Sequence, residues 1–457
     1  MIHATLSQII PILVAQHIGQ DVTFTGCGTD TRQDLTGQLF VALRGERFDA
    51  HQFTDKAQQQ GAIALLVSEP VTTNLPQIIV KDTRLALGQL ARFWRQQFDI
   101  PIIAVTGSNG KTTTKEMLKA IFAQQGQVHA TQGNFNNDIG LPLTLFNLAK
   151  NHDSAILEMG ANHIGEIAYL TQIAQPNVAL ITLCAPAHLT GFKTIENIAQ
   201  TKGEIFSGLA PDGIAVINQD DRFSAFWREL AQPHPVIQFG LSSQADVSAR
   251  HVQLSTMESQ FELSTFKGQI QICLPLAGQH NIMNALAAAA CALACDIELD
   301  IIKSGLESIQ PVAGRLQTFM GLNHSTLIND TYNANPSSFK AALAVLQQYP
   351  APRWLVMGDM GELGLDSMTL HQEISDIAYK MGVEKLWAIG DYSRYAVDSF
   401  QGQAQHFTTH DALLDALSIA LMQQSHVTLL LKGSRSMTIE KITFGLRVED
   451  RHAALVK

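Results

Sequence analysis

The chain has 457 residues, a net charge of −10 and a hydrophobic content of 46%. A chain of this length is expected to form about three domains, and its hydrophobic content excludes wholesale disorder. The acidic balance argues against a nucleic-acid partner, although local basic loops remain compatible with a negatively charged small substrate.

The five cysteines are scattered, and no Cys-x-x-Cys pair occurs. This usage favours a reducing compartment and argues against a disulfide framework or a zinc site. The longest apolar run, Ala285 to Cys295, is shorter than the roughly 20 residues that span a bilayer. The N-terminus lacks a basic segment followed by an apolar core, so we expect a cytoplasmic protein with no membrane partner.

Residues 1–98 are predicted to form a small α/β domain that begins with a helix over Thr5–Ala15. The strands expected in it are Val22–Thr25, Leu39–Leu43, Ala62–Val67 and Gln77–Val80. Asp82 is predicted to cap the helix that follows. The inner face of that helix is predicted to carry Leu85, Leu90, Phe93 and Trp94. Polar loop residues such as Thr31 and Arg32 can bind a uracil or a pyrophosphate, but residues of these types are more often turn and capping residues.

Residues 99–311 are predicted to form a central domain in which strands and helices alternate as in a parallel sheet. Its first strands are expected at Ile100–Thr106, Ser154–Met159 and Val178–Leu183. Alternating residues from about Asp246 to Pro275 indicate antiparallel strands, and an alanine-rich helix follows. Residues 312–457 are predicted to form a Rossmann-like domain, although no Gly-x-Gly-x-x-Gly fingerprint follows its first strand. Its strands are expected at Thr326–Asn329, Trp354–Met357, Lys385–Ile389 and Val427–Leu431.

The stretch from Ile102 to Thr114 has the order of a P-loop: a buried strand, a glycine turn and the start of a helix. Backbone N–H groups of the turn and the helix N-terminus favour an anion. Lys111 is expected to reach the outer phosphates, and the Thr112 hydroxyl is placed to bind Mg²⁺. Val105 stands where the strict pattern has glycine, so this is a variant, and a chance strand–turn–helix is the alternative. The residues predicted to bind ATP here are Gly107, Ser108, Asn109, Gly110, Lys111, Thr112 and Thr113.

Further polar residues follow the predicted strands of the central domain. Glu158 and His188 fall at strand ends, where open α/β sheets bind ligands, and a strand-end acid can hold Mg²⁺. The amide-rich segment 133–140, with Asn134 and Asn137, is interpreted as a substrate loop, with a plain turn as the alternative. Lys202 lies in a predicted helix over 194–208, and sequence physics alone does not distinguish it from a solvated helix residue.

Two asparagines after the antiparallel strands are also candidates. Asn281 and Asn284 lie one helical turn apart on one face, where their amides can read an adenine edge or a ribose. The alternative is that they are a cap and a helix-surface residue. The C-terminal unit adds polar loops at strand ends or domain junctions, and these loops are 314–315, 330–336, 358–364 and 432–435.

Taken in this order, the motifs resemble those of the Mur ligase family. The resemblance is carried by Ala104–Thr113, Glu158-Met159-Gly160, Ala187-His188-Leu189, Lys202-Gly203-Glu204, His280-Asn281-x-x-Asn284, Gly314-Arg315 and Asp330. Within the family, the segments 332–336 and 432–435 resemble the branch that adds D-alanyl-D-alanine, and the Asp-Asn-Pro-Arg signature of the diaminopimelate-adding branch is absent. Three departures from the family pattern are Leu183-Cys184-Ala185, Thr190 and Asn329.

The resemblance implies an ATP-dependent amide ligase that joins D-Ala-D-Ala to UDP-N-acetylmuramoyl-tripeptide through an acyl phosphate, giving the pentapeptide precursor of peptidoglycan. It implies ATP and two Mg²⁺ ions as cofactors, with Lys202 carbamylated, and we expect a monomer. The alternatives are another amino-acid-adding Mur ligase, a folylpolyglutamate synthase, or a P-loop regulator without ligase activity.

The resemblance also assigns roles to residues. The catalytic residues implied are Lys111, Lys202, His188 and Glu158. The metal ligands implied are Thr112, Glu158, His188 and carbamylated Lys202. Beyond the P-loop, the ATP contacts implied are Asn281, Asn284, Arg315 and Asp330. The substrate contacts implied are Thr31, Arg32, Asn134, Asn137, Tyr332, Asn333, Asn335, Lys432, Ser434 and Arg435.

Overall fold

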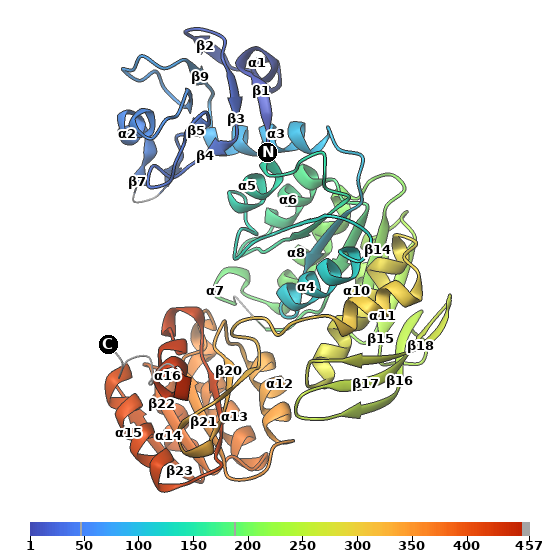
Figure 1. The fold of residues 1–457 in the computed structure, drawn as a ribbon, viewed down its shortest axis with the longest axis vertical. Helices are drawn as coiled ribbons and strands as arrows, with labels where there is room; N and C mark the ends of the chain where they lie inside the picture. The colour runs from blue at the N-terminus through green and yellow to red at the C-terminus, as the bar shows by residue number, and fades with distance from the viewer. Residues whose placement is uncertain (46–47, 187–188, 450–457) are drawn as a thin grey trace.

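The computed structural model describes residues 1–45, 48–186 and 189–449. Three α/β units follow one another along the long axis of the molecule, in chain order from the N-terminus to the C-terminus (Figure 1). This arrangement confirms the predicted three-domain α/β architecture with a central, mainly parallel sheet. No helix of the part described is both long and apolar enough to cross a membrane.

The N-terminal unit is built on a five-stranded sheet with helices beside it. The strand order is β2 (Gln16–Ile18), β9 (Gln77–Ile79), β8 (Ala64–Val67), β5 (Leu39–Val41) and β4 (Cys27–Gly28). Two antiparallel pairs accompany it: β1 (His3–Thr5) with β3 (Thr23–Thr25), and β6 (Arg44–Gly45) with β7 (Phe48–Asp49). Its helices are α1 (Leu6–Leu13), which contains Pro11, α2 (Thr54–Gln59) and α3 (Thr83–Arg95). The four strands predicted here are therefore all present, each one to two residues shorter than expected.

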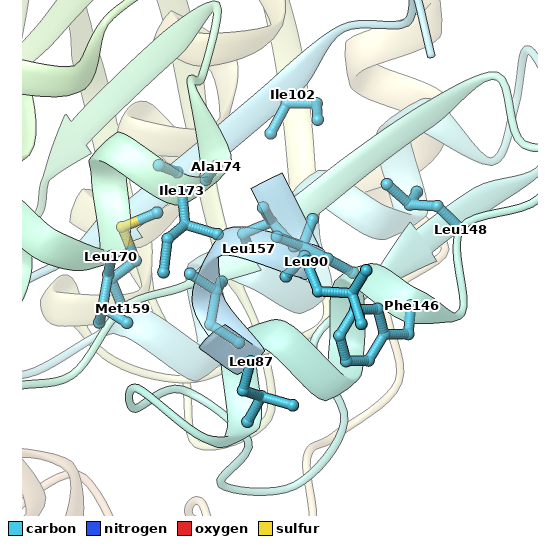
Figure 2. Packing of buried hydrophobic residues seen from close by; sticks show 14 of the residues in the cluster. Leu87, Leu90, Ile102, Phe146, Leu148, Leu157, Met159, Leu170, Ile173 and Ala174 are labelled. Carbon is cyan, nitrogen blue, oxygen red and sulfur yellow. The ribbon is translucent and has the colours of Figure 1, made fainter. Parts of the chain in front are cut away.

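Helix α3 joins the N-terminal unit to the central one. As predicted, the Asp82 carboxylate caps it by accepting hydrogen bonds from two backbone N–H groups. The inner face carries Leu87 and Leu90, which pack among buried side chains of α5, α6 and β12 (Figure 2). The prediction for Leu85 was wrong, because this side chain is 53% exposed. The buried stripe runs through Thr83 and residues 86–88, 90 and 91, and position 85 lies outside it.

Gly88 lets α3 approach α6, which gives a testable prediction. A Cβ at this position would collide with the Tyr169 hydroxyl and lie 2.9 Å from Cδ1 of Ile173. We therefore expect Gly88→Ala to destabilise the protein by about 1 to 3 kcal/mol through overpacking, although alanine is the better helix former. Urea unfolding measures this change. The exposed neighbour Gln89 is the control, and a Gly88→Ala protein no less stable than Gln89→Ala would contradict the tight contact.

The central unit contains a nine-stranded sheet whose first strands position the site. The order is β11 (Val128–Ala130), β12 (Ser154–Glu158), β10 (Ile102–Thr106), β13 (Val178–Ile181), β14 (Ile214–Asn218), β15 (Val236–Gly240), β16 (Val247–Leu254), β17 (Ser259–Thr265) and β18 (Gly268–Leu274). Pairing is parallel from β11 to β16 and antiparallel from β16 to β18, as expected for residues 246–275. Because β10 lies between β12 and β13, the carboxyl ends of these three strands meet at one edge.

The helices of the central unit cover both faces of this sheet. They are α4 (Lys111–Phe122), α5 (Gly140–Phe146), α6 (Glu166–Ala174), α7 (Leu189–Phe192), α8 (Ile195–Gly203), α9 (Ser224–Leu230), α10 (Gln279–Ala294) and α11 (Leu299–Glu307). The single helix predicted over 194–208 is instead α8 followed by a 3₁₀ turn over Glu204–Gly208. The alanine-rich α10 is buried along most of its length and packs against α4, and its Cys291 is a buried core residue.

The C-terminal unit is a six-stranded sheet. Its order is β19 (Gln317–Met320), β20 (Thr326–Asp330), β24 (Thr428–Lys432), β21 (Arg353–Gly358), β22 (Lys385–Ile389) and β23 (Gln403–Phe407). All neighbours are parallel except β19 with β20. The helices are α12 (Pro336–Leu346), α13 (Ser367–Lys380), α14 (Ser393–Ser399), α15 (His410–Gln423) and α16 (Glu440–Leu446). The ends of β20 and β24 lie side by side and face the central unit through the loop before α12.

Candidate active site

The turn between β10 and α4 has the backbone that its glycines predict. Gly110 adopts φ +83°, a left-handed conformation that side chains disfavour, immediately before α4 begins at Lys111. The free N–H groups of that helix start therefore point into the turn. The Lys111 ammonium donates to the Gly107 carbonyl at 2.8 Å, and burial lowers the pKa of Lys111 despite the nearby Glu158 carboxylate. This local geometry suits an anion such as a phosphate.

Glu158 stands beside the turn at the carboxyl end of β12, as the strand order predicts. It is 3% exposed. Its Oε2 accepts a hydrogen bond from the Thr112 hydroxyl at 3.0 Å, and its Oε1 accepts one from the Asn136 amide at 2.9 Å. A hydroxyl and a carboxylate oxygen together are the hard donors that Mg²⁺ prefers. In the part of the chain described, no group of three or more His, Cys, Asp or Glu side chains could hold a metal ion.

Lys202 lies on α8 and lines the same cavity as the P-loop, although a helical lysine is usually solvated. Its exposure is only 8%. Burial, with a smaller contribution from the Lys111 charge, lowers the pKa of Lys202 to about 7. A substantial fraction of this amine is therefore neutral and nucleophilic near neutral pH. His188, predicted as its metal-binding neighbour, lies outside the described residues.

Two further residues of the P-loop make contacts that the sequence did not indicate. The Ser108 hydroxyl donates to the Ala185 carbonyl at 2.9 Å and accepts from the Ala185 N–H at 3.0 Å. It thus braces the loop that follows β13. The Asn109 and Asn335 side chains exchange two amide hydrogen bonds, of 3.3 and 2.7 Å, which link the P-loop directly to the N-cap of α12.

Two adjoining cavities meet at this edge of the sheet. The smaller, about 160 Å³, lies between α10 and the start of the C-terminal unit. The predicted residues that line it are Asn109, Gly110, Thr113, Asn281, Asn284, Arg315, Asp330 and Lys432. The larger, about 560 Å³, runs from the P-loop between the central and C-terminal units. The predicted residues that line it are Gly107 to Thr112, Asn134, Asn137, Glu158, Lys202, Arg315, Tyr332, Asn333, Asn335, Ser434 and Arg435.

Arg315 borders both cavities. Its guanidinium lies 4.3 Å above the Tyr332 ring centroid, and its buried Nε has no hydrogen-bond partner among the residues that are described. An unpaired buried donor of this kind is costly unless a ligand satisfies it. Arg315 therefore brings a positive charge to the junction of the two cavities.

Some predicted residues lie elsewhere, and some cleft residues were missed. Thr31 and Arg32 line neither cavity, and Arg32 forms an exposed ion pair with Asp30. Lys432 lines the smaller cavity and not the larger cleft, because it is buried in an ion pair with Asp330. The missed residues that line the larger cleft include Arg84, Asn136, Asn162, Glu166 and Glu362. Asn136 sits between two predicted asparagines, so its segment gave the signal although its side chain was not selected.

Three family models match the chain in sequence order. "Mur ligase family, catalytic domain" covers residues 23–95, "Mur ligase middle domain" covers 105–292, and "Mur ligase, glutamate ligase domain" covers 314–435. The UDP-N-acetylmuramoyl-tripeptide–D-alanyl-D-alanine ligase of Escherichia coli (strain K12) is 43% identical over 98% of this chain and 99% of its own length.

Solved structures agree with these matches. MurF from Acinetobacter baumannii is 37% identical with a TM-score of 0.92, and the match covers 97% of this chain and 98% of that one. MurF from Thermotoga maritima, solved in complex with ADP, is 27% identical with a TM-score of 0.80, and the match covers 92% of this chain and 96% of that one. The chain belongs to the Mur ligase family.

Proposed function

We propose that this chain joins D-alanyl-D-alanine to UDP-N-acetylmuramoyl-tripeptide in an ATP-dependent reaction that supplies the pentapeptide precursor of peptidoglycan. The Escherichia coli relative at 43% identity carries this activity in its name, and a structure from Acinetobacter baumannii at 37% identity is named as a D-alanyl-D-alanyl ligase. The observation that carries the proposal is the contact between Thr112 and Glu158, in a cleft lined by both the central and the C-terminal units.

The nucleotide occupies the smaller cavity and the adjoining P-loop. Asn281 and Asn284 lie one turn apart on α10 and face the base or ribose, and Asp330 lies near the ribose. Arg315 and Lys111 neutralise the charge on the phosphates, and the free N–H groups of the turn donate hydrogen bonds to the phosphate oxygens. The larger cleft holds the peptide end of the UDP substrate and the dipeptide, with Asn134 and Asn137 in its wall.

The donors around Glu158 fit magnesium, which supplies charge neutralisation between the ATP phosphates and the substrate carboxylate when bound. Thr112, Glu158, His188 and a carbamate on Lys202 would hold two such ions. The lowered pKa of Lys202 supports the carbamate, because the neutral amine forms an N–C bond to CO₂ and releases one proton. This converts a buried cation into an anionic oxygen donor.

In this reaction the protein mainly positions the reactants and contributes little covalent chemistry. The substrate carboxylate attacks the γ-phosphorus of ATP, ADP leaves, and the dipeptide amine displaces phosphate from the acyl phosphate. Lys111 and Arg315 stabilise the charge that builds up on the transferred group. Asn109 and Asn335 hold the C-terminal unit against the P-loop, which keeps water away from the acyl phosphate.

The organisation of the chain is part of the proposal. We place domain boundaries near residues 98 and 311, which fall between α3 and β10 and between α11 and β19. The N-terminal domain, with the loops at 30–53, seats the UDP end of the substrate. The protein acts in the cytoplasm as a monomer.

Mass spectrometry of the product tests the activity directly. With UDP-tripeptide, D-Ala-D-Ala and ATP, we expect the mass of UDP-pentapeptide and one ADP per amide bond. A panel of single amino acids is the control, and it should give little ADP release. Turnover that does not depend on D-Ala-D-Ala, or that is stimulated better by a single amino acid, would assign the chain to another branch.

A further inference from the structure

A second lysine of α4 is buried beneath the P-loop. Lys115 lies one helical turn after Lys111, is 3% exposed, and lines neither cavity. Its ammonium donates to the Thr131 carbonyl at 2.7 Å and pairs with the Glu116 carboxylate at 2.7 Å. Burying an ammonium is costly, and these two acceptors offset the cost. The charge therefore acts on the protein and not on a phosphate.

Thr131 connects this lysine to the site. It is 1% exposed and directly follows β11. Its backbone N–H donates to the Ile156 carbonyl at 3.0 Å, and its hydroxyl accepts from the Glu158 backbone N–H at 3.0 Å. The hydroxyl thus serves as an acceptor for β12 just beyond the end of β11, and it fixes the backbone of Glu158.

The Glu158 carboxylate is held from the other side by Thr112 and Asn136. A shift of its backbone would move the carboxylate away from the Thr112 hydroxyl, because the side chain is buried and has little freedom to compensate. We propose that Lys115 and Thr131 are positioning residues, which set the Glu158 carboxylate for magnesium at the P-loop. This inference rests on the metal role proposed for Glu158.

Removing the Thr131 hydroxyl tests the inference. Binding of a non-hydrolysable ATP analogue is measured by calorimetry, with Mg²⁺ and with EDTA, together with the melting temperature. In Thr131→Val we expect Mg²⁺-dependent affinity to fall about tenfold, as for partners that orient metal ligands, with affinity in EDTA unchanged. Thr131→Ser keeps the hydroxyl and is expected to restore binding. If Thr131→Val does not fold, Lys115→Met carries the same test.

The control is Thr171→Val on α6, which removes a buried hydroxyl that donates to the Ile205 carbonyl and lines neither cavity. It should lower the melting temperature without changing either affinity. The same result for Thr131→Val would make its role merely structural and overturn the inference. An equal loss of ATP-analogue affinity with and without Mg²⁺ would also overturn it, because the substitution would then be disturbing the phosphate-binding turn and not the metal site.

Glu158→Gln separates this inference from the metal role on which it rests. In Glu158→Gln, loss of the gain in ATP-analogue affinity that Mg²⁺ normally gives supports the metal role. If that loss occurs while Thr131→Val binds normally, only the positioning inference fails. If Glu158→Gln leaves the gain intact, the metal role of Glu158 fails and the inference fails with it.

Discussion

Lys202→Met is expected to lower ligase activity by on the order of 100- to 1000-fold. The same change is expected to stabilise the substrate-free protein. The activity falls because methionine cannot form the carbamate that we propose as a metal ligand. The stability rises because a buried amine, whose pKa burial lowers to about 7, is replaced by an apolar side chain of similar length. The expected gain at pH 6 is about 1 to 4 kcal/mol, measured by urea unfolding in CO₂-depleted buffer.

The sign of the pH dependence follows from the same shift. The Lys202 amine has a pKa of about 7 when folded and 10.5 ordinarily, so between these values the unfolded chain binds more protons. The free energy of unfolding of the wild type therefore rises with pH across this window, and the stability gained by Lys202→Met becomes smaller. The control is Lys119, which lies on the solvent-exposed side of α4. Lys119→Met should show no such pH dependence of stability.

Two outcomes would contradict this account of Lys202. A Lys202→Met protein that is less stable than wild type at pH 6 would mean that a favourable partner holds the ammonium. Carbon-13 NMR with labelled bicarbonate is expected to show a carbamate signal in wild type that disappears in Lys202→Met. Retention of that signal in the variant would place the carbamate on another amine.

The sequence predicted the part of the site that is built from local signals. The apolar run before the glycine turn is typical of a buried strand, and the strand-end rule predicted Glu158 beside the P-loop if the two strands were neighbours. The 3.0 Å contact between Glu158 and Thr112 agrees with this prediction. The one-turn spacing of Asn281 and Asn284 puts both on one face of α10, and both side chains line the smaller cavity.

The rest of the site depends on contacts between distant parts of the chain. Asn109 and Asn335 are 226 residues apart, and nothing near either one indicates that their amides pair. Helix α5 begins inside the segment interpreted as a loop, because burial of residues such as Leu141 and Leu145 outweighs the poor helix propensity of Gly140 and Pro142. Tertiary packing, which one sequence does not reveal, decides such positions.

Lys432→Met is expected to destabilise the C-terminal unit by about 3 to 5 kcal/mol, because it leaves the Asp330 carboxylate buried without its cation. Lys432 is 1% exposed, and its ammonium contacts Asp330 Oδ2 at 2.5 Å and the Asn333 carbonyl at 3.0 Å. Burial lowers the pKa of Lys432, and the Asp330 carboxylate opposes this shift. Amide hydrogen exchange of β20 and β24 measures the effect in the unit concerned.

Double variants separate the pair from its surroundings. Asp330→Asn combined with Lys432→Met removes both charges, so it should be more stable than Lys432→Met alone. The exposed pair of Lys267 with Asp296, 3.2 Å apart, is the matched control, and Lys267→Met should cost less than about 1 kcal/mol. The Asp330 side chain also lines the smaller cavity, so nucleotide affinity should fall in Lys432→Met and in the double variant. A double variant as unstable as Lys432→Met would show that the lysine acts through its bond to the Asn333 carbonyl, and not through the charge of Asp330.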